Sequence, residues 1–532
     1  MTKIFSNGTT DDRATRAAPS PGASTVRLRR AICSLAGAIL VACSSATPEV
    51  RIVGTETVNS PPPTPRQPQK EQPPPAGPVV QRPFPVVAHA ELDNGLSIDL
   101  IERHALPVAT LALVSASGSA TDADHPGAAR VTALFLEAGG AGRWSSKELR
   151  ETVDGLGATL DISTNRDADS WELSVTSDRV DGALDILGAL VRAPKFAPGE
   201  FRRLKERQIE RVRSLEKTSG MWLARYWLNR ALYELPVGIH PYASVDVLPD
   251  ELQRLTLADC RAWYQKHVTP KNVRLIAVGD LKLDQLVAQA RRVFGAWKSQ
   301  PAAPLSAPEP VPPKGPQIVV LDRPSSTQSD VMLGVLGPSR HDSDFANIYT
   351  MQQVIGGGVA GRLFLDIREK RSLAYATYAG TMDVREGPSV LYLAAGTQTA
   401  KTAETVGLLL EHLERAGSGP VGAEELETAR RYLIDGMPAR WETVEGLADQ
   451  WLTVFELGLG DDYYDTLRAD IARSTPASVE AAASKYYRLD RSVVVVAGDA
   501  RSVAQDLATH GPVDVLSPEQ GFRIRQHLDA RR

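Results

Sequence analysis

Histidine and cysteine bind transition metals more often than other residues, and this chain arranges neither type for that purpose. Its three cysteines, at positions 33, 43 and 260, include no C-x-x-C pair. No two of its histidines have the helical spacing that lets a pair share one metal ion. The histidines stand at positions 89, 104, 125, 240, 267, 341, 412, 510 and 527. We therefore expect no metal in this chain, and Cys260 is expected to be inert core.

Arg368 and Tyr375, seven positions apart, could stabilise negative charge. A guanidinium is always charged and a phenol is a rigid neutral donor, so both could direct hydrogen bonds at charge developing on a carbonyl oxygen. Alternatively, Arg368 belongs to a solvated helix end with Lys370 and Arg371, and Tyr375 packs in a strand. These residues alone support both interpretations equally.

The three glycines Gly356–Gly358 could suggest phosphate binding. They lack the spacing and the lysine of a P-loop, however. A tight turn between helices is favoured over a mobile lip where peptide enters.

The composition indicates a globular protein of two or three domains. Its 532 residues are 42% hydrophobic and 23% charged, which is enough for substantial cores. The net charge of -4, with no run of like charge, gives no field that would attract nucleic acid, so we exclude nucleic acid as a partner.

The N-terminus is typical of an exported protein. Basic residues precede the apolar run Ala31–Ala42, which is too short for the roughly 20 residues of a membrane span. Cys43 follows directly after small residues, as in a lipoprotein signal. We predict a signal peptide over residues 1–42, acylation at Cys43, and a periplasmic, membrane-anchored protein, with the outer membrane favoured over the inner. A plain secretory signal is the alternative.

Two proline-rich stretches divide the rest of the chain. Residues 43–85 should form an extended tether, because dense proline prevents a packed core. Residues 301–316 should form a linker between the blocks on either side.

These blocks repeat each other at an offset of 219 positions. Gly118 recurs as Gly337, Gly139–Arg143 as Gly358–Arg362, and the strand-like run 275–280 as 494–499. Three coincidences at one offset indicate duplication, and a period this long makes each copy a domain.

The pattern within each copy predicts an α+β fold. A hairpin is expected at Asp93–Gly95, and helices around 130–136, 184–191 and 201–215. We expect two homologous domains, each a mostly antiparallel sheet with helices on one face. The domains should cover 86–300 and 317–500, followed by a C-terminal extension over 501–532.

From Val86 to about Ala500 the chain resembles the pitrilysin/insulinase family of zinc peptidases, in the two-domain form that includes mitochondrial processing peptidase. The resemblance rests on the hairpin, the glycine-bearing helix junctions, the strand ends and, most specifically, the segment Arg362–Tyr375. It implies that the two domains form half of a clamshell.

Active members of this family carry the zinc motif H-x-x-E-H on a helix. The corresponding positions here hold Arg130, Ala133 and Leu134, which replace both ligands and the base, and the second copy also lacks the motif. The third ligand of active relatives falls at Glu210, for which a solvated helix carboxylate is favoured over a ligand. Glu137 could be a displaced base, but no ligand stands beside it.

The same resemblance gives Arg368 and Tyr375 a role. In relatives such a pair in the second domain holds the substrate backbone and stabilises the oxyanion. The first copy has Leu149 and Leu156 at the equivalent positions, so the pair belongs to the second copy alone.

The resemblance therefore implies a non-catalytic, substrate-positioning subunit of a heterodimeric periplasmic zinc endopeptidase. The partner subunit would carry H-x-x-E-H and the zinc, and this chain alone would be inactive. An extended peptide would bind as an added strand, for which 158–163 is a candidate edge in the first copy. Two alternatives are a scaffold protein derived from the fold and an active peptidase with unconventional ligands.

Overall fold

The computed structural model describes residues 82–122, 125–233, 240–244, 246–298, 305 and 307–531. These belong to one compact unit that spans 78–532. The predicted signal peptide, Cys43 and nearly all of the tether lie outside the described residues, as do 301–304 and 306 of the linker. No helix in the described part of the chain has the length and apolar character needed to cross a membrane.

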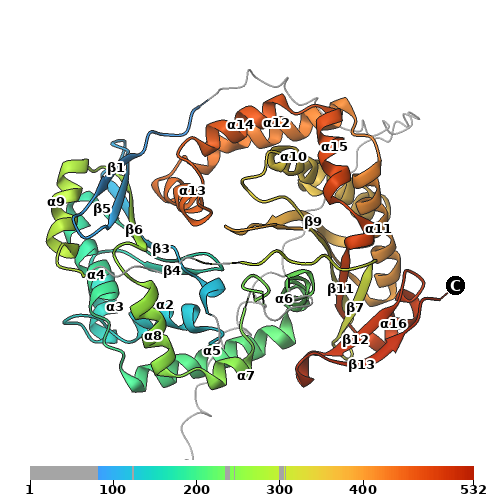
Figure 1. The fold of residues 1–532 in the computed structure, drawn as a ribbon, viewed down its shortest axis with the longest axis horizontal. Coiled ribbons are helices and arrows are strands. Elements are labelled where there is room, and N and C mark those ends of the chain that lie inside the picture. Colours follow the sequence, from blue (N-terminus) through green and yellow to red (C-terminus); the bar gives the residue numbers. More distant parts are fainter. Residues whose placement is uncertain are drawn as a thin grey trace, which may run out of the picture. The chain divides into compact units, whose positions relative to one another are not determined.

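The first half of this unit builds a six-stranded sheet in the order β1-β2-β6-β3-β5-β4 (Figure 1). Only β2 and β6 are parallel neighbours. The predicted hairpin at Asp93–Gly95 connects β1 to β2, with Gly95 at a φ of +86° that glycine tolerates without strain. The strands are β1 (Ala88–Glu91), β2 (Ser97–Glu102), β3 (Val108–Ser115), β4 (Leu160–Thr164), β5 (Asp169–Thr176) and β6 (Val273–Gly279).

The second half builds a seven-stranded sheet in the order β13-β12-β7-β11-β8-β10-β9. Its parallel neighbours are β7 with β11 and β7 with β12. The central strand β11 is buried along its whole length, which explains its uninterrupted apolar sequence. The strands are β7 (Gln317–Asp322), β8 (Gln328–Leu336), β9 (Ala374–Met382), β10 (Val390–Gln398), β11 (Val493–Gly498), β12 (Val513–Ser517) and β13 (Arg523–Leu528).

The prediction that 501–532 is an extension beyond the second domain needs correction. Helix α16 (Ala500–Leu507) packs on β7 and β12, and β12 and β13 belong to the second sheet itself. The sequence of β13 has no apolar alternation because most of its side chains are exposed, so the pattern gave no strand signal.

The topology confirms the duplication. Five strands of the first sheet, β2-β6-β3-β5-β4, have the same order as β7-β11-β8-β10-β9 of the second. Helices α8 (Leu257–His267) and α15 (Pro476–Tyr486) begin and end 219 positions apart. The two-domain, mostly antiparallel α+β prediction is therefore confirmed.

Each half covers one face of its sheet with its own helices, as predicted. In the first half α2, α4 and α9 pack on the strands, and in the second half α10, α11 and α16 do so. The first-half helices are α2 (Ala128–Ala138), α3 (Ser146–Gly155), α4 (Val180–Arg192), α5 (Pro198–Thr218), α6 (Gly220–Tyr233), α7 (Pro249–Arg254) and α9 (Leu283–Phe294). The second-half helices include α10 (Phe345–Gly356), α11 (Thr402–Ser418), α12 (Ala423–Arg440), α13 (Val444–Glu456) and α14 (Tyr463–Arg473).

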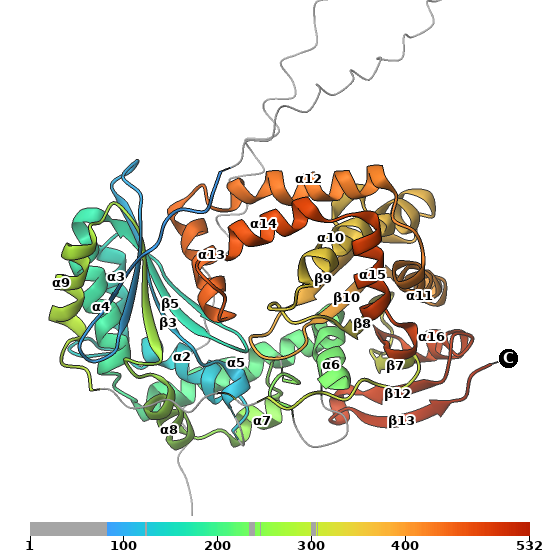
Figure 2. The ribbon, with the colours of Figure 1, turned by 45° about the horizontal axis from the view of Figure 1, so that its top comes forward.

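The other face of each sheet is covered by a helix from the opposite half, which the sequence did not predict. Helix α6 packs on β8 and β11, whereas α13 packs on β3 and β6. Figure 2 shows α6 against the second sheet and α13 against the first. The contact at α6 is close: a Cβ added at Gly334 would lie 2.9 Å from the Leu228 side chain. The two halves therefore exchange equivalent helices.

A buried polar contact fixes α13 on the first sheet. The indole of Trp451, which is 1% exposed, donates a 2.7 Å hydrogen bond to Asp99 on β2, itself 2% exposed. Asp99 also accepts from Arg274 at 2.8 Å and lies 2.9 Å from the imidazole of His89. Because a buried carboxylate requires such partners, this cluster specifies where α13 docks.

Trp451→Phe should therefore destabilise the protein by about 2 kcal/mol, since it removes a buried hydrogen bond to a carboxylate and leaves a small void. The measurement is the midpoint of urea unfolding. Trp297→Phe is the matched control, because Trp297 is only partly buried and its indole donates to no carboxylate of the described residues. Equal losses in the two variants would contradict the role given to the Asp99 contact.

Candidate functional site

The positions of the zinc motif lie on α2, but none of them presents a ligand. Ala133 is fully buried, and its carbonyl oxygen accepts a 3.0 Å hydrogen bond from the indole of Trp171. Leu134 packs against the hydrophobic core of the first half. Both side chains are therefore packing groups.

Arg130 replaces the first ligand with a half-buried cation. Its guanidinium donates to the Thr164 hydroxyl at 3.1 Å, whereas its Nε has no hydrogen-bond partner. Burial lowers the pKa of Arg130, and the positive charges of Arg211 and Arg225 act in the same direction. A cation held here would repel a zinc ion.

Two buried carboxyl groups lie within electrostatic range of α2. Asp122 accepts hydrogen bonds from the backbone N–H groups of Gly127 and Ala129, both at 2.7 Å, at the start of the helix. Burial raises the pKa of Asp122 to about 7. Asp169 is fully buried and neither of its oxygens has a partner; burial, and then the charge of Asp122, raise its pKa well above the usual range.

Glu210 and Glu137 do not compensate for the missing ligands. Glu210 is exposed on α5 and forms a 2.7 Å ion pair with Arg213, as expected for a solvated helix carboxylate. Glu137 is half-buried and lies 3.6 Å from Arg150, and burial raises its pKa. Within the described residues no three histidine, cysteine or acidic side chains are grouped so that they could hold a metal ion. The described residues at these positions do not fit zinc.

The structure brings Arg368 and Tyr375 together. The guanidinium of Arg368 lies 4.9 Å from the centre of the Tyr375 ring and 4.7 Å from that of Phe364. Tyr375 lies in a strand, β9, but its side chain is 84% exposed, so the interpretation in which it packs there is wrong. The nearest carboxylate is Glu369, at a distance of 3.8 Å from Arg368.

Unusual backbone geometry produces this pairing. Arg368 lies in a π-helix, Phe364–Lys370, a rare form that often marks functional sites. Ser372, between this helix and β9, has a φ of +54°, which is uncommon for a residue other than glycine. Together these features bring the end of the helix back over the start of the strand.

Strand β9 is an edge strand, because it pairs with β10 and with no other strand of its sheet. Its exposed aromatic residues are Tyr375 and Tyr378, which are 84% and 54% exposed. In the first sheet the corresponding edge strand is β4, which confirms the predicted edge near 158–163. No hydrogen bond, ion pair or ring contact among the described residues joins the Arg368–Tyr375 pair to α2.

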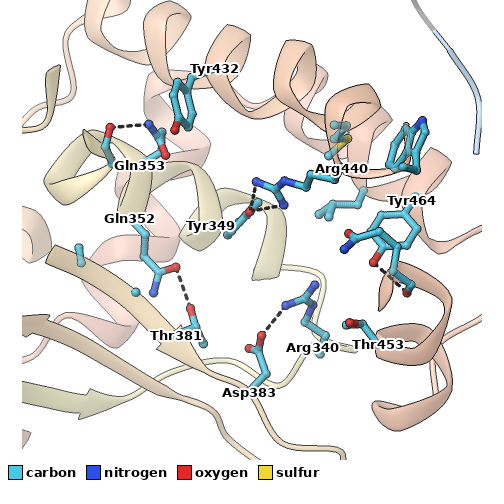
Figure 3. Close-up of a pocket in the computed structure, with 17 residues that line it drawn as sticks. Arg340, Tyr349, Gln352, Gln353, Thr381, Asp383, Tyr432, Arg440, Thr453 and Tyr464 are labelled. Carbon is cyan, nitrogen blue, oxygen red and sulfur yellow. Dashed lines mark hydrogen bonds and ion pairs between the residues drawn. The ribbon is translucent and has the colours of Figure 1, made fainter. Parts of the chain in front are cut away.

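The second half contains a cavity of about 500 Å³ that the sequence did not predict, shown in Figure 3. Three of its lining residues, Tyr349, Gln352 and Gln353, lie 219 positions after Arg130, Ala133 and Leu134. The repeat offset could therefore have drawn attention to them. Gly357, which follows α10 in a short turn between helices, also lines the cavity, and the predicted helix-to-helix turn at the glycines is confirmed.

Comparison with known families agrees with this geometry. Residues 99–237 match the family described as Insulinase (Peptidase family M16), and residues 254–433 match the one described as Peptidase M16 inactive domain. The chain belongs to peptidase family M16. The first match lies within the first half, whereas the second begins in the first half, at the end of α7, and extends into α12 of the second half.

Relatives within M16 include proteins named as peptidases and as non-peptidases. The non-peptidase homolog YmxG of Helicobacter pylori is 25% identical over 73% of this chain and 88% of its own length. The zinc protease PqqE of the same strain is 22% identical over 53% of this chain and 63% of its own length. A crystal structure of a peptidase M16 inactive domain from Pseudomonas fluorescens is 28% identical, with a TM-score of 0.71, over 78% of this chain and 98% of that one.

Asp169→Asn should stabilise the protein increasingly as pH rises. Folding raises the pKa of Asp169 above its unfolded value. The wild type therefore loses stability as the pH rises from the unfolded pKa towards the folded pKa. The asparagine variant has no such loss, because its side chain does not titrate. The difference should grow by about 1.4 kcal/mol per pH unit in that range. Urea unfolding of both proteins at several pH values between about 5 and 8 measures this difference in stability. A difference that is constant with pH would mean that Asp169 is ionised in the folded protein.

The purified chain should contain far less than one zinc ion per molecule, because Arg130, Ala133 and Leu134 offer no ligand. Metal analysis by mass spectrometry after dialysis against zinc-containing and then zinc-free buffer measures this. Stoichiometric zinc that a chelator removes would favour the active peptidase with unconventional ligands.

Proposed function

We propose that this chain is a non-catalytic subunit of a heterodimeric periplasmic zinc endopeptidase, which positions peptides for a partner of the same family. The observation that carries the proposal is the contact of Arg368 with Tyr375 beside the open edge of β9. The zinc position of the first half holds Arg130 instead of a ligand. The described residues thus include groups suited to substrate and no cluster suited to a metal ion.

The edge of β9 suits an extended peptide. An edge strand offers unpaired backbone N–H and C=O groups, so a peptide can bind as an additional strand through main-chain hydrogen bonds. Such bonds do not depend on side chains, and the proposed substrates are therefore peptides or unfolded proteins of varied sequence. The exposed ring of Tyr375 adds apolar contact at the start of this strand.

Arg368 and Tyr375 would act on the carbonyl group of the bound peptide. The guanidinium and the phenolic hydroxyl can both donate hydrogen bonds to the carbonyl oxygen as negative charge develops there. Arg368 is 38% exposed at its side chain, so it is accessible to a peptide on β9. The partner would supply the zinc and the water that attacks the peptide.

The location and the partner are also part of the proposal. Acylation at Cys43 would anchor the chain to the periplasmic face of a membrane, with the outer membrane favoured. The proposed partner carries H-x-x-E-H. The presence of a non-peptidase homolog and a zinc protease of this family in one Helicobacter pylori strain supports a pairing of this kind.

The test is capture of the chain from its native host, followed by a cleavage assay with the captured partner on an unstructured peptide. A chain bearing H-x-x-E-H should co-purify. Tyr375→Phe and Arg368→Ala should each lower kcat by about 100-fold, the usual effect of losing one oxyanion donor, while the partner remains bound.

Tyr378→Phe and Arg415→Ala are the matched controls. Tyr378 is an exposed tyrosine of the same strand, and Arg415 is an exposed arginine of α11 that pairs with Glu411. Both should retain full activity. Cleavage that is unaffected by the Arg368 and Tyr375 variants would favour a scaffold role, and a chain that captures no such partner would refute the subunit proposal.

A further inference from the structure

The cavity of the second half lies where the repeat places the counterpart of the zinc position. Tyr349, Gln352 and Gln353 of α10 line it, and they correspond to Arg130, Ala133 and Leu134. Packing groups and a cation occupy these positions in the first half. In the second half the same helix positions border about 500 Å³ of open space between α10, α12, α13, α14 and β9 (Figure 3).

Two hydrogen-bond donors in this cavity lack strong partners. Gln352 is 5% exposed; its amide oxygen accepts from the Thr381 hydroxyl at 2.7 Å, but its amide nitrogen has no partner. Arg440 reaches only the Tyr349 hydroxyl, at 3.3 and 3.4 Å, and forms no ion pair with a carboxylate of the described residues. A buried amide without a partner is costly, so an acceptor supplied by a ligand would stabilise this side chain.

The other charges of the cavity cancel. Arg340 forms a close ion pair with Asp383 and donates to the Tyr463 hydroxyl. Asp383 is the only carboxylate among the residues that line the cavity. The free positive charge therefore belongs to Arg440, and the cavity favours an anion.

We infer that this cavity binds the C-terminal carboxylate of a peptide. A guanidinium matches the planar carboxylate, and the Gln352 amide is a second donor in the wall of the same cavity. The rings of Trp441, Tyr432 and Tyr464 provide walls for an apolar side chain next to it. This assignment rests on the proposed function, because it names the part of the substrate that the chain recognises.

The cavity is continuous with the proposed peptide-binding strand. Ala379, Gly380 and Thr381 of β9 form part of its wall, and Tyr375 lies at the other end of the same strand. A peptide aligned along β9 could therefore place its terminus in the cavity and an internal peptide bond near Arg368. Holding the C-terminus would fix which bond is presented.

The test compares one unstructured peptide without acidic side chains as its C-terminal acid and as its C-terminal amide. Both carry a fluorophore at the N-terminus, and anisotropy measures their binding to the full chain. The acid should bind about tenfold more tightly, the effect of a charge-assisted hydrogen bond. Arg440→Gln and Gln352→Leu should each remove most of this preference, whereas Arg473→Gln, an exposed arginine of α14, should keep it.

Equal binding of the acid and the amide to the wild type would overturn the inference, as would an unchanged preference in Arg440→Gln. Inorganic phosphate that displaces the peptide more strongly than acetate at equal ionic strength would instead identify a phosphate site. The assay needs neither partner nor cleavage, and Arg368→Ala should leave the ratio of acid to amide binding unchanged. Its failure is therefore distinguishable from failure of the proposed subunit function.

Discussion

The two halves of this protein depend on an exchange of helices. Each sheet has one face covered by its own helices and the other covered by α6 or α13 from the opposite half. A sheet with a bare apolar face would not be stable in water, so neither half can complete its core alone. The buried hydrogen bond from Trp451 to Asp99 fixes the position of α13 on the first sheet, because the indole N–H reaches the carboxylate only when the helix is docked in this position.

Within this shared frame the two copies have diverged at equivalent places. On α2 the old metal positions are closed by Ala133 and Leu134 and by the half-buried cation Arg130. On α10 the equivalent positions border a cavity with unused donors. The positions of the arginine–tyrosine pair differ as well: Tyr375 on β9 lies beside the guanidinium of Arg368, whereas the first copy has leucine at both equivalent positions, in α3 and at its end. Among the described residues, the cavity and the arginine–tyrosine pair at these equivalent places thus both lie in the second copy.

Much of the fold and part of the site could be predicted from the sequence. The Asp93–Gly95 turn, the apolar run of β11 and the 219-residue offset follow from local rules, and the loss of ligands at Arg130 follows from residue identity. The helix exchange could not be predicted, because the amphipathic pattern around Trp451 shows that one face is buried but not against which sheet. The exposure of Tyr375 depends on the π-helix and on the positive φ of Ser372, and no residue pattern predicts either feature. The cavity depends on the packing of five elements, and Gln352 alone looks like an ordinary helix residue.

The helix exchange also bears on how such a chain evolves. A first domain that has lost its metal chemistry would ordinarily be free to decay or be deleted. Here its helix α6 forms part of the core of the second domain, where Leu228 packs against Gly334. Loss of the first domain would expose the core of the second. Selection on the second domain therefore preserves the fold of the first.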